Sequence, residues 1–299
     1  MSLQDRASPF SPYRSDGKLY GFICVVTGAV QPIGQAIVRE LAAHGAACVY
    51  ACTRSESEDA SSLVKSLSDS HPNTKIISYP LSLSDEQATL ALIDDVLNAW
   101  GRLDVWVTSS GLLGPPSIDA TTPADLQKCF EANSLAPFFA LKYAPPAMGK
   151  LTPKGHYPNA AEKDVKYGSI IVVSSVASTY GGCWGPCYTM SSHAALGVVR
   201  AGVAVLKGTG VRINCVSPGQ IDVGVDLKDI DVRGMTSQLP PAQSKESQKE
   251  HIGLERAGIP TEVARVAGFL ASGFSSYMTG ANMVVDGGAS TMCPLTVPI

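Results

Sequence analysis

Residues 22–34, with the sequence FICVVTGAVQPIG, contain the pattern that decides the fold. The first part, Phe22–Thr27, is continuously apolar and rich in β-branched side chains, which is typical of a parallel strand buried on both faces. Gly28 begins a turn, and apolar side chains in the next segment, 33–44, recur at helical spacing until Gly45 ends the helix. This stretch therefore predicts a central strand, a turn and a helix.

The alternation of apolar strands and amphipathic helices continues through most of the chain. Such alternation, with short crossovers, leaves few topologies other than a doubly wound parallel sheet with helices on both faces. We therefore expect one α/β domain over residues 21–299. The further strands are expected at 47–52, 75–79, 103–108, 169–174 and 212–216, and the further helices at 55–68, 85–100, 123–143 and 188–207.

Three segments depart from this alternation. Residues 1–20 mix charged residues, Ser and Pro, and are expected to form a flexible arm. Residues 145–168 are polar and interrupted by Pro and Gly between a helix and a strand, which is typical of a surface insertion. Residues 220–254 follow the carboxyl end of a central strand, where open α/β sheets bind ligands, so we expect them to form a lid over the substrate.

Composition narrows the function classes. Of the 299 residues, 45% are hydrophobic and 16% charged, and the net charge is −3. Because the basic residues are scattered, we expect a small-molecule partner rather than nucleic acid or a membrane surface. Residues 1–20 lack an apolar signal-peptide core, and no apolar run is long enough to span a membrane, so we expect a cytoplasmic protein.

The chain contains eight cysteines. Cys183 and Cys187 are close in sequence, but no second pair of Cys or His accompanies them at the spacing of a zinc site. We therefore expect no metal, and reduced, buried thiols are the simpler interpretation in a cytosolic protein.

Ser175 and Tyr188 are the strongest candidates for catalysis. They stand thirteen residues apart, after an expected buried strand and before an expected helix. A phenol that is neutral at rest but can transiently carry negative charge suits proton exchange with a substrate oxygen. Residues 27–34, TGAVQPIG, form a Gly-containing turn before a helix, the kind of turn that binds a pyrophosphate.

In these motifs the chain resembles the short-chain dehydrogenase/reductase family of the classical type, over residues 21–288. The resemblance implies a Rossmann-type domain that assembles as a homodimer or homotetramer. It implies that Tyr188 exchanges a proton with the substrate oxygen, that Ser175 polarises this oxygen, and that Asn133 is the asparagine of the catalytic tetrad. The fourth member of the tetrad, a lysine four residues after the tyrosine, is replaced here by Ser192.

The resemblance also implies a dinucleotide site, several positions of which are changed. Pro32 replaces a Gly of the turn and lacks an N–H donor, although a proline also suits the first position of a helix. Ser82 and Ser109 stand where family members have Asp and Asn, and Val223 stands where they have a threonine that contacts the nicotinamide. Arg54 follows the second strand, where an arginine favours the 2′-phosphate of NADP(H) or is simply exposed to solvent. If a cofactor is retained, its expected contacts are Gly28, Pro32, Ile33, Gly34, Arg54, Ser82, Ser110, Gly111, Pro218, Gly219 and Ile221.

Three functions remain open. The leading hypothesis is an enzyme that requires no cofactor and uses Tyr188 and Ser175 for isomerisation, dehydration or cyclisation. The second is an atypical NADPH-dependent carbonyl reductase, in which water or Ser192 covers for the missing lysine. The third is a catalytically silent subunit that only binds. Trp184 and Val223 are expected to line a largely apolar substrate pocket, unless Trp184 packs in the core or at a subunit contact.

Overall fold

Seven strands form one sheet in the order β3-β2-β1-β4-β5-β6-β7 in the computed structural model, which describes residues 12–55, 57–152, 162–181, 184–224, 233 and 249–292. Every neighbouring pair of strands is parallel. The expected doubly wound α/β fold is therefore confirmed. The strands are β1 (Ile23–Thr27), β2 (Cys48–Thr53), β3 (Lys75–Pro80), β4 (Val105–Thr108), β5 (Gly168–Val173), β6 (Val211–Pro218) and β7 (Asn282–Val285).

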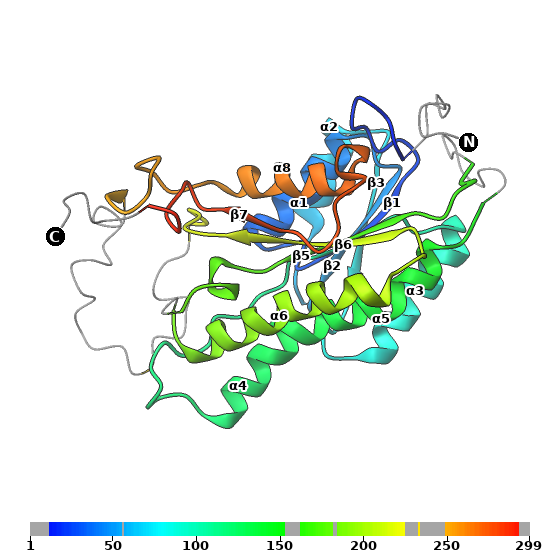
Figure 1. Ribbon diagram of the computed structural model, residues 1–299. Coiled ribbons are helices and arrows are strands. Elements are labelled where there is room, and N and C mark those ends of the chain that lie inside the picture. The colour runs from blue at the N-terminus through cyan, green and yellow to red at the C-terminus, as the bar shows by residue number, and fades with distance from the viewer. Residues whose placement is uncertain are drawn as a thin grey trace.

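Helices cover both faces of the sheet (Figure 1). Helices α1, α2 and α8 contribute buried side chains to the core on one face. Helices α3, α5 and α6 contribute to the core on the other face, and α4 extends beyond it. The bounds are α1 (Pro32–Ala43), α2 (Ser61–Ser70), α3 (Glu86–Trp100), α4 (Pro123–Phe130), α5 (Ala136–Met148), α6 (Pro186–Val205) and α8 (Pro260–Ala271).

The long helix expected over residues 123–143 is interrupted by a π-helical turn. Helix α4 passes into the π-helix η2 (Glu131–Leu135), and α5 then continues to Met148. Pro145 lies inside the last turn of α5. Its nitrogen cannot donate, but its carbonyl oxygen accepts a hydrogen bond from the Gly149 amide at 2.9 Å. The proline therefore marked the last turn of a helix and not its end.

The expected surface insertion over residues 145–168 is wrong at both of its described ends. Its first residues belong to α5, and Thr152 and Lys163 then form an antiparallel bridge with amide–carbonyl distances of 3.0 and 2.9 Å. The Lys163 side chain is fully buried. Residues 153–161 lie outside the described residues. The insertion thus returns to the core before β5 begins.

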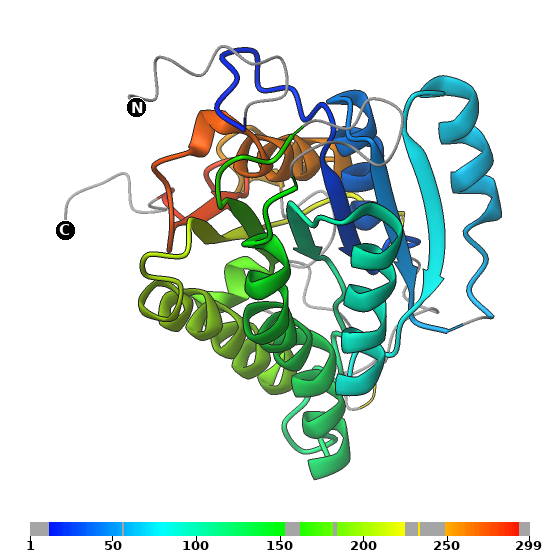
Figure 2. The ribbon, with the colours of Figure 1, turned by 90° about the vertical axis from the view of Figure 1, so that its right-hand side faces the viewer.

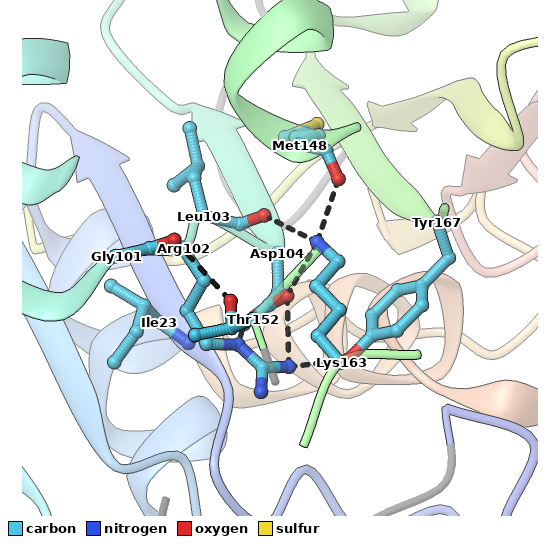
Figure 3. A network of polar contacts seen from close by, with 9 residues as sticks. All are labelled: Ile23, Gly101, Arg102, Leu103, Asp104, Met148, Thr152, Lys163 and Tyr167. Carbon is cyan, nitrogen blue, oxygen red and sulfur yellow. Dashed lines mark hydrogen bonds and ion pairs between the residues drawn. The ribbon is translucent and has the colours of Figure 1, made fainter. Parts of the chain in front are cut away.

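Lys163 enters a polar network at the amino end of the sheet (Figure 3). Its Nζ donates to the carbonyl oxygen of Leu103 at 3.0 Å, to that of Met148 at 2.7 Å and to Oδ1 of Asp104 at 3.0 Å. The ammonium group therefore uses all three of its donors on acceptors from the start of β4 and the end of α5. A lone lysine in a polar stretch gave no sign of this role.

Asp104 is the one carboxylate among the groups that Figure 3 joins. Its Oδ2 accepts hydrogen bonds from the Ile23 amide and from Nε of Arg102, both at 2.8 Å, and Arg102 also donates to the Tyr167 hydroxyl. Burial alone would raise the pKa of Asp104, but the Arg102 guanidinium and the Lys163 ammonium outweigh it and lower that pKa. The carboxylate stays ionised and joins β1, β4 and the insertion.

The expectation of a flexible arm over residues 1–20 needs correction for its described part. Leu19 is fully buried, and its amide donates to the His44 carbonyl oxygen at 2.8 Å. Gly17 lies against the ring of Phe274, and the chain leading into β1 crosses beside α8 (Figure 2). Residues from 12 onward are therefore anchored, and residues 1–11 lie outside the described residues.

Most of the expected lid over residues 220–254 also lies outside the described residues, which here include 220–224, 233 and 249–254. In its first described part, Ile221 pairs with Gly258 as an isolated parallel bridge, and the Gly258 amide donates to the Gln220 carbonyl oxygen at 2.9 Å.

Among the helices that the structure describes, none has the length and apolar composition of a membrane span.

Candidate functional site

The carboxyl ends of β1, β4, β5 and β6 meet at one edge of the sheet because these strands are parallel. Strands β2 and β3 lie beyond β1, whereas β5 to β7 lie beyond β4, so the strand order reverses between β1 and β4. Open α/β sheets bind ligands at such a point. Gly28, Ser110, Ser175 and Gly219, four of the residues expected at the site, follow these four strand ends.

Ser175 is fixed where β5 ends. Its side chain is buried, and its Oγ accepts a hydrogen bond from the Ala177 amide at 3.1 Å, which caps the short 3₁₀ helix η3 (Val176–Ser178). Because this bond uses the oxygen as an acceptor, the hydroxyl proton is left to donate to a substrate oxygen. Helix η3 contacts α6, whose third residue is the half-buried Tyr188. The loop between β5 and α6 thus brings together the elements that carry both residues.

Asn133 lies in the π-helical turn η2 and links two walls of the site. Its Oδ1 accepts from the Leu112 amide at 2.8 Å, and its Nδ2 donates to the Leu112 carbonyl oxygen at 2.9 Å and to Ser191 Oγ at 2.8 Å. Single π-helical turns inside α-helices are frequent at functional sites. The turn re-aims Asn133 so that one amide holds both the loop after β4 and helix α6.

Ser191 is a site residue that the sequence reasoning missed. Its Oγ accepts from Asn133 and donates to the Cys187 carbonyl oxygen at 2.7 Å, in the first turn of α6 beside Tyr188. The neighbouring Ser192, at the usual lysine position, is 2% exposed, and its carbonyl oxygen accepts from Ser174 Oγ at 3.4 Å.

The turn after β1 keeps two glycines for reasons internal to the protein. Gly28 has φ +66°, and a Cβ there would lie 2.9 Å from the Ser109 carbonyl oxygen. A Cβ on Gly34 would overlap the carbonyl oxygen of Gly28. Pro32, in contrast, is the exposed first residue of α1. Both glycines are therefore required by the packing of the turn, whether or not a ligand binds.

The residues present fit a dinucleotide poorly. Ile33 and Gly34 keep first-turn N–H groups that have no intrahelical acceptor, but Pro32 has none. The hydroxyls of Thr108, the last residue of β4, and of Ser109, which follows it, are fully covered and have no hydrogen-bond partner. Because both hydroxyls are covered, neither is exposed to form a hydrogen bond with a ligand.

Arg54 is engaged by a neighbouring carboxylate. It directly follows β2, and its Nε donates to Glu58 Oε1 at 2.6 Å while its own amide donates to Glu58 Oε2 at 2.7 Å. Ser82 follows β3, is exposed, and accepts the Asp85 amide at 3.2 Å through its carbonyl oxygen. Both residues follow the ends of neighbouring strands, and the charge of Arg54 is already paired with Glu58.

The far side of the groove follows β6. Pro218 is the last residue of β6, and the Gly219 amide donates to the Val285 carbonyl oxygen at 2.9 Å. Ile221 packs against the core on the α8 face, and Val223 is half-buried. These positions continue the edge of the sheet.

Trp184 holds the loop after β4 and is strained. Its φ is +61°, unusual for a residue with a bulky side chain, and its indole Nε1 donates to the Gly114 carbonyl oxygen at 2.9 Å. Gly111 is in the same loop, and a Cβ placed on it would lie 3.8 Å from Asn133 Oδ1. Asn133 and Trp184 therefore bind the two ends of this loop, and Trp184 is half-buried.

Other polar groups near the site have local roles. His193 is exposed, with Nδ1 3.0 Å from the Thr189 carbonyl oxygen, which agrees with an ordinary helix histidine. Within the described ranges, no group of three or more His, Cys, Asp and Glu side chains is arranged to hold a metal ion.

Comparisons with known proteins extend this description. A family model described as Enoyl-(Acyl carrier protein) reductase matches residues 28–290. The maize sex determination protein tasselseed-2 is 32% identical over 94% of this chain and 83% of its own length. The 3-oxoacyl-(acyl-carrier-protein) reductase of Thermotoga maritima is 30% identical over 91% of this chain and 98% of its own length. A solved dehydrogenase/reductase from Sinorhizobium meliloti has a TM-score of 0.73 at 25% identity, covering 92% of this chain and 97% of that one.

Proposed function

Because the chain belongs to the short-chain dehydrogenase/reductase family, we propose that it is an enzyme in which Tyr188 and Ser175 perform acid–base chemistry without hydride transfer. The substrate would be an oxygenated, mostly apolar small molecule, and the reaction an isomerisation, dehydration or cyclisation. One observation carries this proposal. Gly28 and Gly34 are retained where packing requires a glycine, whereas positions whose role would be to contact a dinucleotide, such as Pro32 and Ser192, are changed.

Retention of Gly28 and Gly34 does not argue for a bound cofactor. Protein backbone fills the space that a Cβ would take at either residue. The position free of such a constraint is the exposed Pro32, and there the N–H donor is gone. If each of the five changed contacts at Pro32, Ser82, Ser109, Ser192 and Val223 costs about 1 kcal/mol, the affinity falls by roughly three to four orders of magnitude.

Ser192 removes a second requirement of hydride transfer. A lysine at this position would supply a charge that stabilises a phenolate and three donors for a ribose, whereas a buried serine supplies no charge and only one hydroxyl donor. Tyr188 would then act as a hydroxyl donor to the substrate oxygen, next to the Ser175 hydroxyl. Two donors on one oxygen stabilise the negative charge that develops there during enolisation, elimination or ring closure.

A second candidate function rests on Arg54. An arginine directly after β2 suits the 2′-phosphate of NADP(H), and relatives of this chain are named as dehydrogenases and reductases. In this alternative the chain is an NADPH-dependent carbonyl reductase with Tyr188 as proton donor. The existing bond between Arg54 and Glu58 competes with a phosphate, which is why we rank this function second.

Titration of the purified chain with NADPH and NADH, followed by cofactor fluorescence, separates the two functions. We expect no saturation up to about millimolar concentration, and binding in the range of about micromolar would replace the first function with the second. Candidate oxygenated substrates are then screened for isomers, dehydration products or cyclised products. Tyr188→Phe should abolish product formation, and the exposed Tyr277→Phe is the matched control. Equal activity of Tyr188→Phe and the unmodified chain would overturn the assigned role of Tyr188.

We further propose a cytoplasmic homodimer or homotetramer that acts on a small molecule. Exposed apolar side chains support an assembly: Phe138 on α5 is 44% exposed and Met190 on α6 is 49% exposed. Light scattering after gel filtration measures the assembly state, and a fluorescent fusion shows where the chain resides. A monomer at about micromolar concentration would contradict the assembly.

A further inference from the structure

Two buried cysteines face one point beneath the loop after β4. Gly114 has φ +69°, and a Cβ placed on it would lie 2.7 Å from the Cys129 sulfur and 3.7 Å from the Cys187 sulfur. Both side chains are fully buried. Cys129 comes from α4 and Cys187 from α6, two helices that contact each other. The absence of a side chain at Gly114 is what lets the two sulfurs lie this close to the loop.

The pair lies between the residues that shape the candidate site. Cys129 is the second-last residue of α4, one helical turn before Asn133, and Cys187 directly precedes Tyr188. Ser191 connects the two sides, since it accepts from Asn133 at 2.8 Å and donates to the Cys187 carbonyl oxygen at 2.7 Å. A bond between the two sulfurs would therefore tie the segment of Asn133 to the segment of Tyr188.

The other described cysteines are placed where they cannot pair with one another. Cys24 and Cys48 contribute to the cores on opposite faces of the sheet. Cys48 and Cys52 lie on one strand, four residues or about 13 Å apart. Cys215 is on β6, separated from β2 by three strands. Burial raises the pKa of the Cys215 thiol to about 11, and that of the other three still further.

We propose that Cys129 and Cys187 form a redox-active pair that hydrogen peroxide converts to a disulfide. Peroxide oxidises one thiol to a sulfenic acid and releases one water; the second thiol then attacks this sulfur, forms the S–S bond and releases a second water. Two thiols and one peroxide thus give one disulfide and two waters. Both sulfurs lie within 4 Å of one point, the position that a Cβ on Gly114 would take, so rotation of the two side chains is what would bring them to bonding distance. The disulfide locks α4 to α6 and fixes Asn133 relative to Tyr188.

The test uses the full-length chain and needs no substrate, so its outcome is independent of the proposed function. The protein is treated with hydrogen peroxide, alkylated, and digested under non-reducing conditions with trypsin and chymotrypsin. Trypsin cleaves after Lys128 and Arg200, and chymotrypsin cleaves after Trp184, which separates Cys183 from Cys187. We expect mass spectrometry to find a peptide pair linked through Cys129 and Cys187, which dithiothreitol separates.

Two results would overturn the proposal: a link from Cys129 or Cys187 to any other cysteine, or both thiols remaining reduced while other cysteines oxidise. Thiol titration of the denatured chain supplies a second readout, with a loss of two of the eight thiols expected. Cys129→Ala and Cys187→Ala should each abolish this loss. Cys183→Ala is the matched control and should keep it.

Discussion

The ammonium nitrogen of Lys163 lies 3.0 Å from Oδ1 of Asp104, and both side chains are completely buried. The same carboxylate also binds Arg102, so two buried cations share one anion. Removing the anion therefore leaves two uncompensated charges, whereas removing Lys163 leaves a neutral pair. Replacing Asp104 should therefore lower the stability of the fold more than replacing Lys163.

We expect Asp104→Asn to lower the free energy of unfolding by about 3–5 kcal/mol, the usual cost of leaving buried charges without a partner. Lys163→Met keeps the length of the side chain and the pair between Arg102 and Asp104, so its cost should be about 1–2 kcal/mol. Urea unfolding followed by circular dichroism measures both values. An equal or larger loss for Lys163→Met would show that the network does not depend on Asp104 as its shared anion.

The lowered pKa of Asp104 predicts how stability depends on acid. Between this lowered pKa and the usual value of 3.8, the unfolded chain binds a proton that the folded chain does not, so stability falls as pH drops through this window. Asp104→Asn should flatten this part of the curve of unfolding free energy against pH. Glu262→Gln is the control, because Glu262 has a pKa of about 2 but is exposed beside Arg256, and its effect should be smaller. Identical curves for Asp104→Asn and the unmodified chain would refute the assignment.

The bond between Arg54 and Glu58 predicts how the adenosine end of the groove responds to a phosphate. Glu58→Gln should free the guanidinium and increase the affinity for 2′,5′-ADP about tenfold, because a charge-assisted hydrogen bond becomes available. Calorimetry measures this affinity, with 5′-AMP as the ligand that lacks the 2′-phosphate. The added substitution Arg54→Ala should remove the gain. A gain of the same size for 5′-AMP would mean that Glu58 acts on the groove generally and not through Arg54.

The hydrogen bond from Trp184 to Gly114 predicts local control of the loop after β4. Trp184→Phe removes the indole N–H, keeps an aromatic ring and should cost about 1 kcal/mol, with faster amide exchange over residues 112–116. Hydrogen–deuterium exchange with mass spectrometry resolves this segment. Trp100→Phe is the matched control, because it removes the Trp100 bond to the Tyr50 hydroxyl far from the loop. If both variants speed exchange in this segment equally, Trp184 has no specific hold on it.

The sequence predicted the sheet well because buried parallel strands are continuously apolar. Val105–Thr108 and Gly168–Val173, for example, lie within one or two residues of their expected positions. The π-helical turn at Asn133 escaped prediction because one extra residue in a helical turn leaves the apolar spacing nearly unchanged. The expectation that this helix would end at residue 143 was wrong, because a proline in the last turn removes an N–H donor but leaves its carbonyl oxygen as an acceptor, and α5 continues to Met148.

The site was located from the sequence only as far as local motifs reach. Ser175 and Tyr188 could be placed because a strand end and a helix start bracket them. The contact of Asn133 with Ser191 joins residues far apart in sequence, and neither has a motif that names the other. Lys163 is a similar case, since its partner Asp104 lies 59 residues away and only the folded chain brings the charges together.

The contact between Gly34 and the carbonyl of Gly28 has a consequence for how such chains are classified. A search pattern built on this turn scores two positions that report on folding and one that reports on ligand binding. A chain that binds no cofactor would still need Gly28 and Gly34 for stability, so the pattern would still match it. Counting glycines in this turn will therefore overestimate cofactor use, because packing alone requires Gly28 and Gly34, whereas the exposed middle position, occupied here by Pro32, is not fixed by packing.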